Sequence, residues 1–169
     1  LSIDAPNKAL LKEIDKPLFT DYWERMNKSL DNLKERKERS TIRLTMIKGV
    51  NMIEPDNYAK LIMLDDPNFE VKGYMFVGAS RQVLSLENMP FHEDVLAFTN
   101  ELVKFLPEYE IADEHKPSRV VLLSKKKYFD SEKNSWETWI DFDAFFHLWE
   151  DQKEITAENY GVRFTKHST

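Results

Sequence analysis

Apolar and polar positions along this chain change period repeatedly, from the alternation of strands to the three-to-four spacing of helices. The apolar start at residues 1–4 predicts the end of a strand, and stretches rich in β-branched and aromatic residues predict more strands. The later strands are expected at 41–47, 69–76, 108–112, 119–124 and 136–140. Amphipathic stretches predict helices over residues 6–14, 21–33, 54–64, 91–106 and 142–150.

Strands that alternate with helices are typical of parallel βαβ units. Three units can be recognised, and a complete eight-stranded barrel needs about 250 residues, whereas the chain has 169. The pattern therefore predicts an α/β fold that is half of a barrel or one flank of an open sheet. We expect the half-barrel over residues 1–106, an extension packed on it over 107–151, and a polar, poorly ordered tail over 152–169.

Composition narrows the class of protein. Hydrophobic residues make up 41% of the sequence, which is enough for a packed core. The net charge of -6 excludes a uniformly basic nucleic-acid binder, so RNA binding would need local patches. The absence of cysteine excludes a disulfide scaffold and a thiolate metal site in this chain, and it agrees with a cytoplasmic, reducing compartment. No apolar run approaches the roughly 18 residues of a membrane span.

The first residues also carry information. The sequence begins without an initiator Met and inside a predicted strand. This favours a piece of a longer protein over a trimmed complete domain.

Polar side chains at strand ends are the candidates for chemistry, because reactive groups of parallel α/β folds collect there. Ser2 and Asp4 leave the first strand, and Arg43 and Thr45 share one face of the second. An Arg at such a position could hold a carboxylate or phosphate bidentately, or it could lie on the surface of an edge strand. Lys48 follows the second strand and by itself would be an ordinary exposed lysine.

Two charged residues share a face of the third strand, Glu70 and Lys72. They form either an ion pair at a sheet edge or part of a polar interior, in which a lysine could form a Schiff base with a carbonyl substrate. No two of the four histidines have a metal-ligand spacing, so no metal site is expected. The aromatic residues of 136–149 are expected to pack in the core, with base stacking as the second interpretation.

Several segments together resemble one family. They are residues 2–5, 16–19, 22–25, 43–49, 70–81, 89–93 and 109–119. These segments are similar to the radical-SAM tRNA 4-demethylwyosine synthases of wyosine biosynthesis, and the later ones look more eukaryotic than archaeal. The resemblance covers residues 1–150 and implies that residues 1–106 are the C-terminal half of a radical-SAM barrel.

The resemblance implies a lyase that condenses N1-methylguanosine of phenylalanine tRNA with a two-carbon unit of pyruvate. Its cofactors would be S-adenosylmethionine and [4Fe–4S] clusters, with FMN on an added upstream domain. Its partners would be the tRNA, pyruvate and the upstream, cluster-binding half of the same protein. By position, the resemblance assigns S-adenosylmethionine to Ser2, Asp4, Arg43 and Thr45, pyruvate to Lys48 and Lys72, and RNA to Ser80, Arg81 and His92.

One departure from the family pattern is decisive for activity. The CxxxCxxC loop of the family has no counterpart here, and iron–sulfur clusters need thiolates. We therefore expect this chain by itself to be inactive in the radical step. Two other functions stay open on the sequence: a non-catalytic, tRNA-binding half-barrel, and a cysteine-free Schiff-base lyase.

Overall fold

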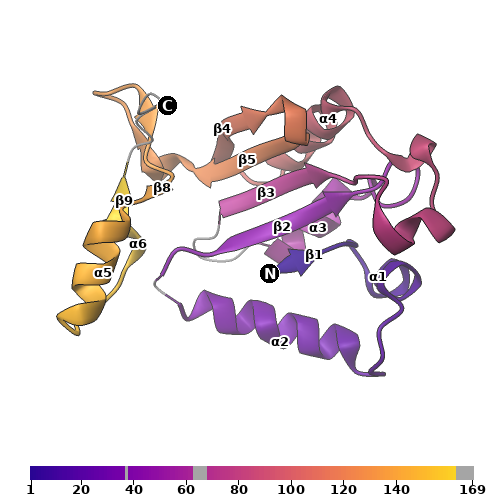
Figure 1. Ribbon diagram of the computed structural model, residues 1–169, viewed down its shortest axis with the longest axis horizontal. Helices are drawn as coiled ribbons and strands as arrows, with labels where there is room; N and C mark the ends of the chain where they lie inside the picture. Colours follow the sequence, from indigo (N-terminus) through magenta and orange to yellow (C-terminus); the bar gives the residue numbers. More distant parts are fainter. Residues whose placement is uncertain (37, 63–67, 163–169) are drawn as a thin grey trace.

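One sheet of five strands organises the protein (Figure 1). The computed structural model describes residues 1–36, 38–62 and 68–162. The strands lie in the order β1-β2-β3-β5-β4. Their bounds are β1 (Ser2–Ile3), β2 (Thr41–Met46), β3 (Asn68–Gly73), β4 (Tyr109–His115) and β5 (Val120–Lys125). The first three are parallel to one another, and β5 runs antiparallel to both β3 and β4.

Helices connect the parallel strands. They are α1 (Lys8–Asp15), α2 (Tyr22–Lys34), α3 (Pro55–Ile62) and α4 (His92–Val103). The side chain of Asn7 accepts a hydrogen bond from the Leu10 amide at 3.0 Å and so begins α1. Pro55 is the first residue of α3, where its missing N–H has no helical partner to lose. Short 3-10 turns fill the connections: η1 (Gly78–Gln82), η2 (Leu86–Asn88), η3 (Lys116–Ser118) and η4 (Lys126–Tyr128).

The hydrophobic core lies between one face of the sheet and helices α2, α3 and α4; α3 and α4 lie behind the sheet in Figure 1. Alternate residues of β2 and β3 point into it, among them Leu44 and Val71, both fully buried. Tyr58 of α3 and Leu102 of α4 meet them from the helix side. The intervening positions of the strands are polar, so the opposite face of the sheet is polar as well.

The predicted α/β class with parallel strands is confirmed. One strand differs from a simple βαβ series, because β5 inserts antiparallel between β3 and β4. The connection from β4 to β5 contains only η3 and Arg119, which takes a left-handed conformation with φ 52°. So short a connection can join only antiparallel neighbours.

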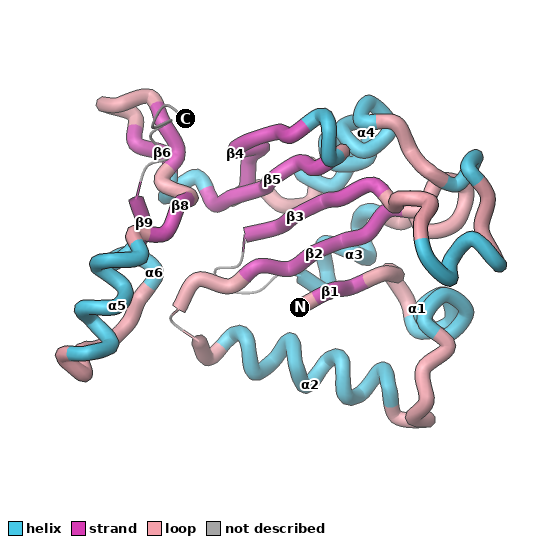
Figure 2. The backbone as a smooth tube through the Cα atoms, viewed as in Figure 1, coloured by secondary structure: helices cyan, strands magenta, loops and turns pink. Residues whose placement is uncertain are grey.

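The C-terminal residues form a small module beside the sheet (Figure 2). Its elements are β6 (Phe129–Asp130), β7 (Ser135–Trp136), β8 (Trp139–Ile140), α5 (Phe142–Glu150), α6 (Ala157–Tyr160) and β9 (Gly161–Val162). The expected strand over 136–140 is wrong as one element: β7 pairs with β6, whereas β8 pairs with β9. Helix α5 has the bounds that the sequence predicts.

The expectation of a poorly ordered tail is wrong for residues 152–162, while residues 163–169 lie outside the described part. Tyr160 is only 3% exposed, although its neighbours in sequence are polar. Its ring meets Phe145 edge-on at 5.3 Å, and its hydroxyl accepts the backbone N–H of Arg39 at 2.5 Å. The order thus comes from a contact across 121 positions, which local composition does not reveal.

Within 1–36, 38–62 and 68–162, no helix has the length and apolarity needed to span a membrane.

Candidate functional site

The polar face of β1, β2 and β3 gathers most of the candidate residues. Strand pairing places Ser2 beside Arg43 and Arg43 beside Glu70. One step toward the carboxyl ends of the strands, Thr45 lies beside Lys72. Because side chains of paired residues point to the same side of a sheet, these groups line one continuous surface.

Arg43 and Glu70 form the ion pair on this face. Both Nε and Nη2 of Arg43 lie 2.9 Å from Oε2 of Glu70, and the Glu70 side chain is 20% exposed. Glu70 therefore pairs across strands with Arg43 and does not pair with Lys72 along its own strand. Among the described residues, Lys72 has no hydrogen bond or ion pair, so its amine is available on the polar face.

The carboxyl ends of β1 and β2 are joined by a buried amide, that of Asn51. Its Nδ2 donates to the backbone carbonyls of Asp4 and Thr45, both at 2.8 Å. Its Oδ1 accepts the N–H of Ile47 at 2.5 Å. Asn51 is fully buried. Sequence reasoning missed this residue as a member of the site; its place in the short loop after a strand was the available signal.

Asp4 is a second acidic group of the site, in addition to Glu70. Burial raises the pKa of its carboxyl above the ordinary value, against hydrogen bonds from Thr45 and the positive charge of Arg43, which lower the pKa. Its Oδ1 is buried and has no hydrogen-bond partner within the described part of the chain. A buried acceptor in this position fits the hydroxyl or ammonium group of a ligand.

Lys48 points away from the polar face, toward the helix layer. Its Nζ lies 2.9 Å and 3.1 Å from the two carboxylate oxygens of Asp94 in α4, and 5.7 Å from the ring centre of Phe91. The hydrogen bond from Lys48 holds the pKa of Asp94 below its usual range. Lys48 also lines a cavity of about 430 Å³ between α3 and α4. The structure thus separates the environments of the two candidate lysines.

Two of the three candidate RNA contacts lie together in η1. Ser80 donates to the carbonyl of Val77 at 2.6 Å, and Arg81 Nε donates to the carbonyl of Phe76 at 3.1 Å. His92 is elsewhere, in the first turn of α4. It is 6% exposed, and its Nε2 lies 2.8 Å from Oε2 of Glu114 in β4.

Within the described ranges, no three His, Cys, Asp or Glu side chains are grouped so that they could hold a metal ion. The sequence has no cysteine, so its residues do not fit an iron–sulfur cluster.

Residues 64–125 match the sequence family of wyosine base formation. A protein of Oryza sativa subsp. japonica, S-adenosyl-L-methionine-dependent tRNA 4-demethylwyosine synthase, is 42% identical in an alignment that covers 95% of this chain and 25% of that protein. The Homo sapiens protein of the same name, TYW1, is 40% identical in an alignment that covers 96% of this chain and 23% of that protein.

Two solved structures share the fold. One is a structure of TYW1 with a lysine-pyruvate adduct bound, with a TM-score of 0.61 and 28% identity. The other is an archaeal TYW1, with a TM-score of 0.57 and 26% identity. They cover 75% of this chain, which in turn covers 40% and 39% of theirs.

The identities agree with the expected closeness to eukaryotic members, since the rice and human proteins are more similar than the archaeal one. The chain spans about a quarter of the length of the relatives that it matches. By sequence and by fold, the chain is a relative of the tRNA 4-demethylwyosine synthases, and its residues 64–125 are those that match the wyosine base formation family.

Proposed function

We propose that this chain forms the ligand-binding sheet face of a radical-SAM lyase that modifies tRNA in wyosine biosynthesis. The observation that carries the proposal is the polar face, where strand register places Ser2 beside Arg43 and Thr45 beside Lys72. Asp4, the residue after β1, joins this face through its hydrogen bonds with Thr45. The names of the relatives supply the reaction, tRNA 4-demethylwyosine synthesis. A purely tRNA-binding module and a cysteine-free lyase are not favoured, because these relatives are named as S-adenosyl-L-methionine-dependent synthases.

The residues of β1 and β2 fit S-adenosylmethionine. The unpartnered Oδ1 of Asp4 can accept from a ribose hydroxyl or the amino group, and Ser2 and Thr45 add hydroxyls beside it. Arg43 is half exposed, and Glu70 fixes its orientation while Nη1 stays available for the carboxylate. When bound next to a cluster, this cofactor supplies a radical that removes a hydrogen atom from the substrate.

The cluster itself does not fit this chain. Thiolate ligands would have to come from outside these 169 residues. We propose for the same reason that the chain alone is inactive in the radical step. An upstream part of the same protein would supply the clusters, and an added upstream domain would bind FMN.

Lys72 is the better candidate for pyruvate. Schiff-base formation needs an amine that is free to attack a carbonyl, whereas the amine of Lys48 is held 2.9 Å from the carboxylate of Asp94. Lys72 has no such partner in the described residues, and it lies beside Thr45 on the face proposed for S-adenosylmethionine. The solved relative with a lysine-pyruvate adduct supports this chemistry for the family.

For the tRNA we propose contacts from η1 and the start of α4. Arg81 stacks on Phe76 at 5.4 Å and keeps donors for a phosphate. Ser80 lies beside it in η1. His92 is also proposed to contact the tRNA. Because His92 is buried, we propose that Arg81 contributes more of this contact.

Borohydride trapping tests the assignment of Lys72. The complete gene product, reconstituted anaerobically with iron and sulfide, is incubated with labelled pyruvate and borohydride. We expect Lys72→Ala to abolish the label on the protein and Lys48→Ala to retain it. Undiminished labelling of the Lys72 variant would refute the assignment, and a reconstituted protein without cluster absorption would refute the radical-SAM function.

A further inference from the structure

Helix α5 exposes a stripe of large aromatic side chains. Phe142, Phe146 and Trp149 are 60%, 55% and 66% exposed, and Trp139 of the preceding strand β8 is 47% exposed. The spacing of the three helical residues, four and then three positions, places them in one row along the helix. Soluble proteins rarely leave so much contiguous aromatic surface in water unless it binds something.

The stripe does not serve the core of its own module. The inner side of α5 packs through Phe145, whose ring meets Tyr160 edge-on. Asp141 caps the helix by accepting the Ala144 amide at 2.9 Å. The helix is therefore fixed in place without its outer row, which leaves that row free for a second molecule or domain.

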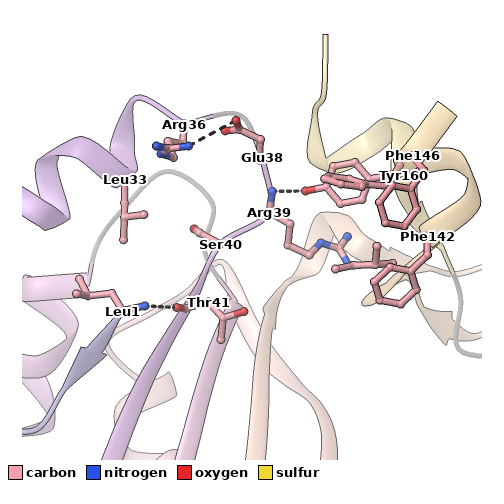
Figure 3. A pocket seen from close by; sticks show the side chains of 12 residues that line it. Leu1, Leu33, Arg36, Glu38, Arg39, Ser40, Thr41, Phe142, Phe146 and Tyr160 are labelled. Carbon is pink, nitrogen blue, oxygen red and sulfur yellow. Dashed lines mark hydrogen bonds and ion pairs between the residues drawn. The ribbon is translucent and has the colours of Figure 1, made fainter. Parts of the chain in front are cut away.

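Beside the stripe lies a cavity of about 550 Å³ at the amino end of β2 (Figure 3). Phe142 and Phe146 form one wall, and Leu33 with Thr41 forms another. Arg36 of this cavity pairs with Glu38 at 3.6 Å, and the two terminal nitrogens of Arg39 donate to the carbonyls of Trp139 and Glu137. The cavity is large enough to receive apolar side chains that a partner inserts between α5 and the sheet.

The charges around the stripe are acidic. Residues 126–162 contain nine acidic and four basic side chains. Asp143 and Glu150, seven positions apart, lie on the same side of α5 next to Phe146 and are exposed. Within the described residues, Asp143 has no basic partner, and Glu150 approaches His147 at 3.7 Å.

This charge pattern distinguishes between the molecules that could bind to the stripe: RNA, a second copy of the chain, or another protein. RNA is a polyanion, so an acidic border opposes the base-stacking interpretation of these aromatic residues. A second copy of the chain, related by a two-fold axis, would bring acidic borders against each other. A partner with basic residues beside an apolar stripe matches both the aromatic row and its border.

We propose that the aromatic face of α5, formed by Trp139, Phe142, Phe146 and Trp149, is a docking surface for a basic amphipathic helix of a protein. The partner helix places apolar side chains at i, i+4 and i+7 against the stripe and into the cavity. Its Lys or Arg side chains lie along Asp143 and Glu150. This docking is independent of the proposed tRNA chemistry, since none of these residues belongs to the polar sheet face.

Two synthetic helical peptides with the same leucine stripe test the proposal, one with lysines along its border and one with glutamates. Calorimetry with the chain is expected to show at least about tenfold tighter binding of the lysine peptide, and this preference should weaken in high salt. Equal affinities for the two peptides would overturn the proposal. So would displacement of the lysine peptide by a single-stranded oligoribonucleotide, or dimerisation of the chain through α5 in sedimentation.

Variants locate the binding on α5. Trp149→Ser is expected to weaken the binding of the lysine peptide by about tenfold, because central aromatic residues contribute most of the binding energy of such interfaces. The double variant Asp143→Lys with Glu150→Lys should reverse the preference toward the glutamate peptide. Phe91→Ser removes an equally exposed aromatic side chain far along the sequence and should leave binding unchanged. Circular dichroism confirms folding; a folded charge-reversal variant that keeps the original preference would overturn the proposal.

Discussion

Replacing Asn51 with Ala tests the structural basis of the candidate site. The side chain is fully buried and forms three hydrogen bonds with backbone groups: the carbonyl of Asp4 directly after β1, the carbonyl of Thr45 in β2, and the N–H of Ile47 after β2. Alanine would leave two carbonyls and one N–H without this partner in a closed environment. Each buried polar group left unpaired costs about 1–3 kcal/mol. Because the three losses share one cavity that water can partly fill, we expect a total of about 3 kcal/mol.

Thermal unfolding followed by circular dichroism gives the measurement. For a chain of this length, 1 kcal/mol shifts the midpoint by about 2–4 °C, so the Asn51→Ala variant should unfold about 6–12 °C lower. Asn57→Ala is the matched control, since the Asn57 amide binds the exposed Glu54 carboxylate at 2.8 Å. That control should change stability by no more than about 0.5 kcal/mol.

The comparison can refute the reasoning. If the free energy of unfolding of the Asn51→Ala variant lies within about 1 kcal/mol of the parent's, the Asn51 amide does not hold β1 to β2 in solution. In that case the proposed alignment of Asp4 with Thr45 loses its support.

Two further predictions concern charge and module attachment. Burial raises the pKa of Asp4 from 3.8, so ionisation of this carboxyl lowers the stability of the fold as the pH rises through the raised pKa. The Asp4→Asn variant should therefore unfold at a higher temperature than the parent near pH 7, and this difference should vanish near pH 3. Equal unfolding midpoints for variant and parent at both pH values would contradict the prediction. Arg39 donates to the carbonyls of Glu137 and Trp139 at 3.0 Å and 3.3 Å, so Arg39→Ala should accelerate amide exchange in β8 and β9 but not in β2. Arg36→Ala, which alters an exposed arginine, should leave that exchange unchanged.

Much of the fold is determined by the sequence alone. The alternation over residues 41–46 gives a strand with one apolar and one polar face, because successive side chains point to opposite sides. The spacing over Phe142–Glu150 and the capping Asp141 give α5 its bounds. The missing cysteines alone decide that no iron–sulfur cluster is held by this chain.

The candidate site depended more on tertiary structure. Arg43, Thr45 and Lys72 could be placed on strand faces from the sequence, since that needs only the two-residue period. The partner of Glu70 could not be predicted from the sequence. Strand register places Arg43, 27 positions away in the chain, next to Glu70, and the ion pair forms there and not with the nearer Lys72. The different environments of Lys48 and Lys72 could not be predicted from the sequence either, because the partner of Lys48 is Asp94 of α4, 46 positions away.

Thus the sequence by itself determined the types of the sheet strands, of the helices that cover the sheet and of α5, their polar and apolar faces, and the absence of thiolates. Only the tertiary structure decided the antiparallel insertion of β5, the amide of Asn51 between two strand ends, and the burial of Tyr160. The physical reason is the range of the interactions. Periodicity and capping act within a few residues, whereas register, ion pairing and burial are set by which distant segments pack together.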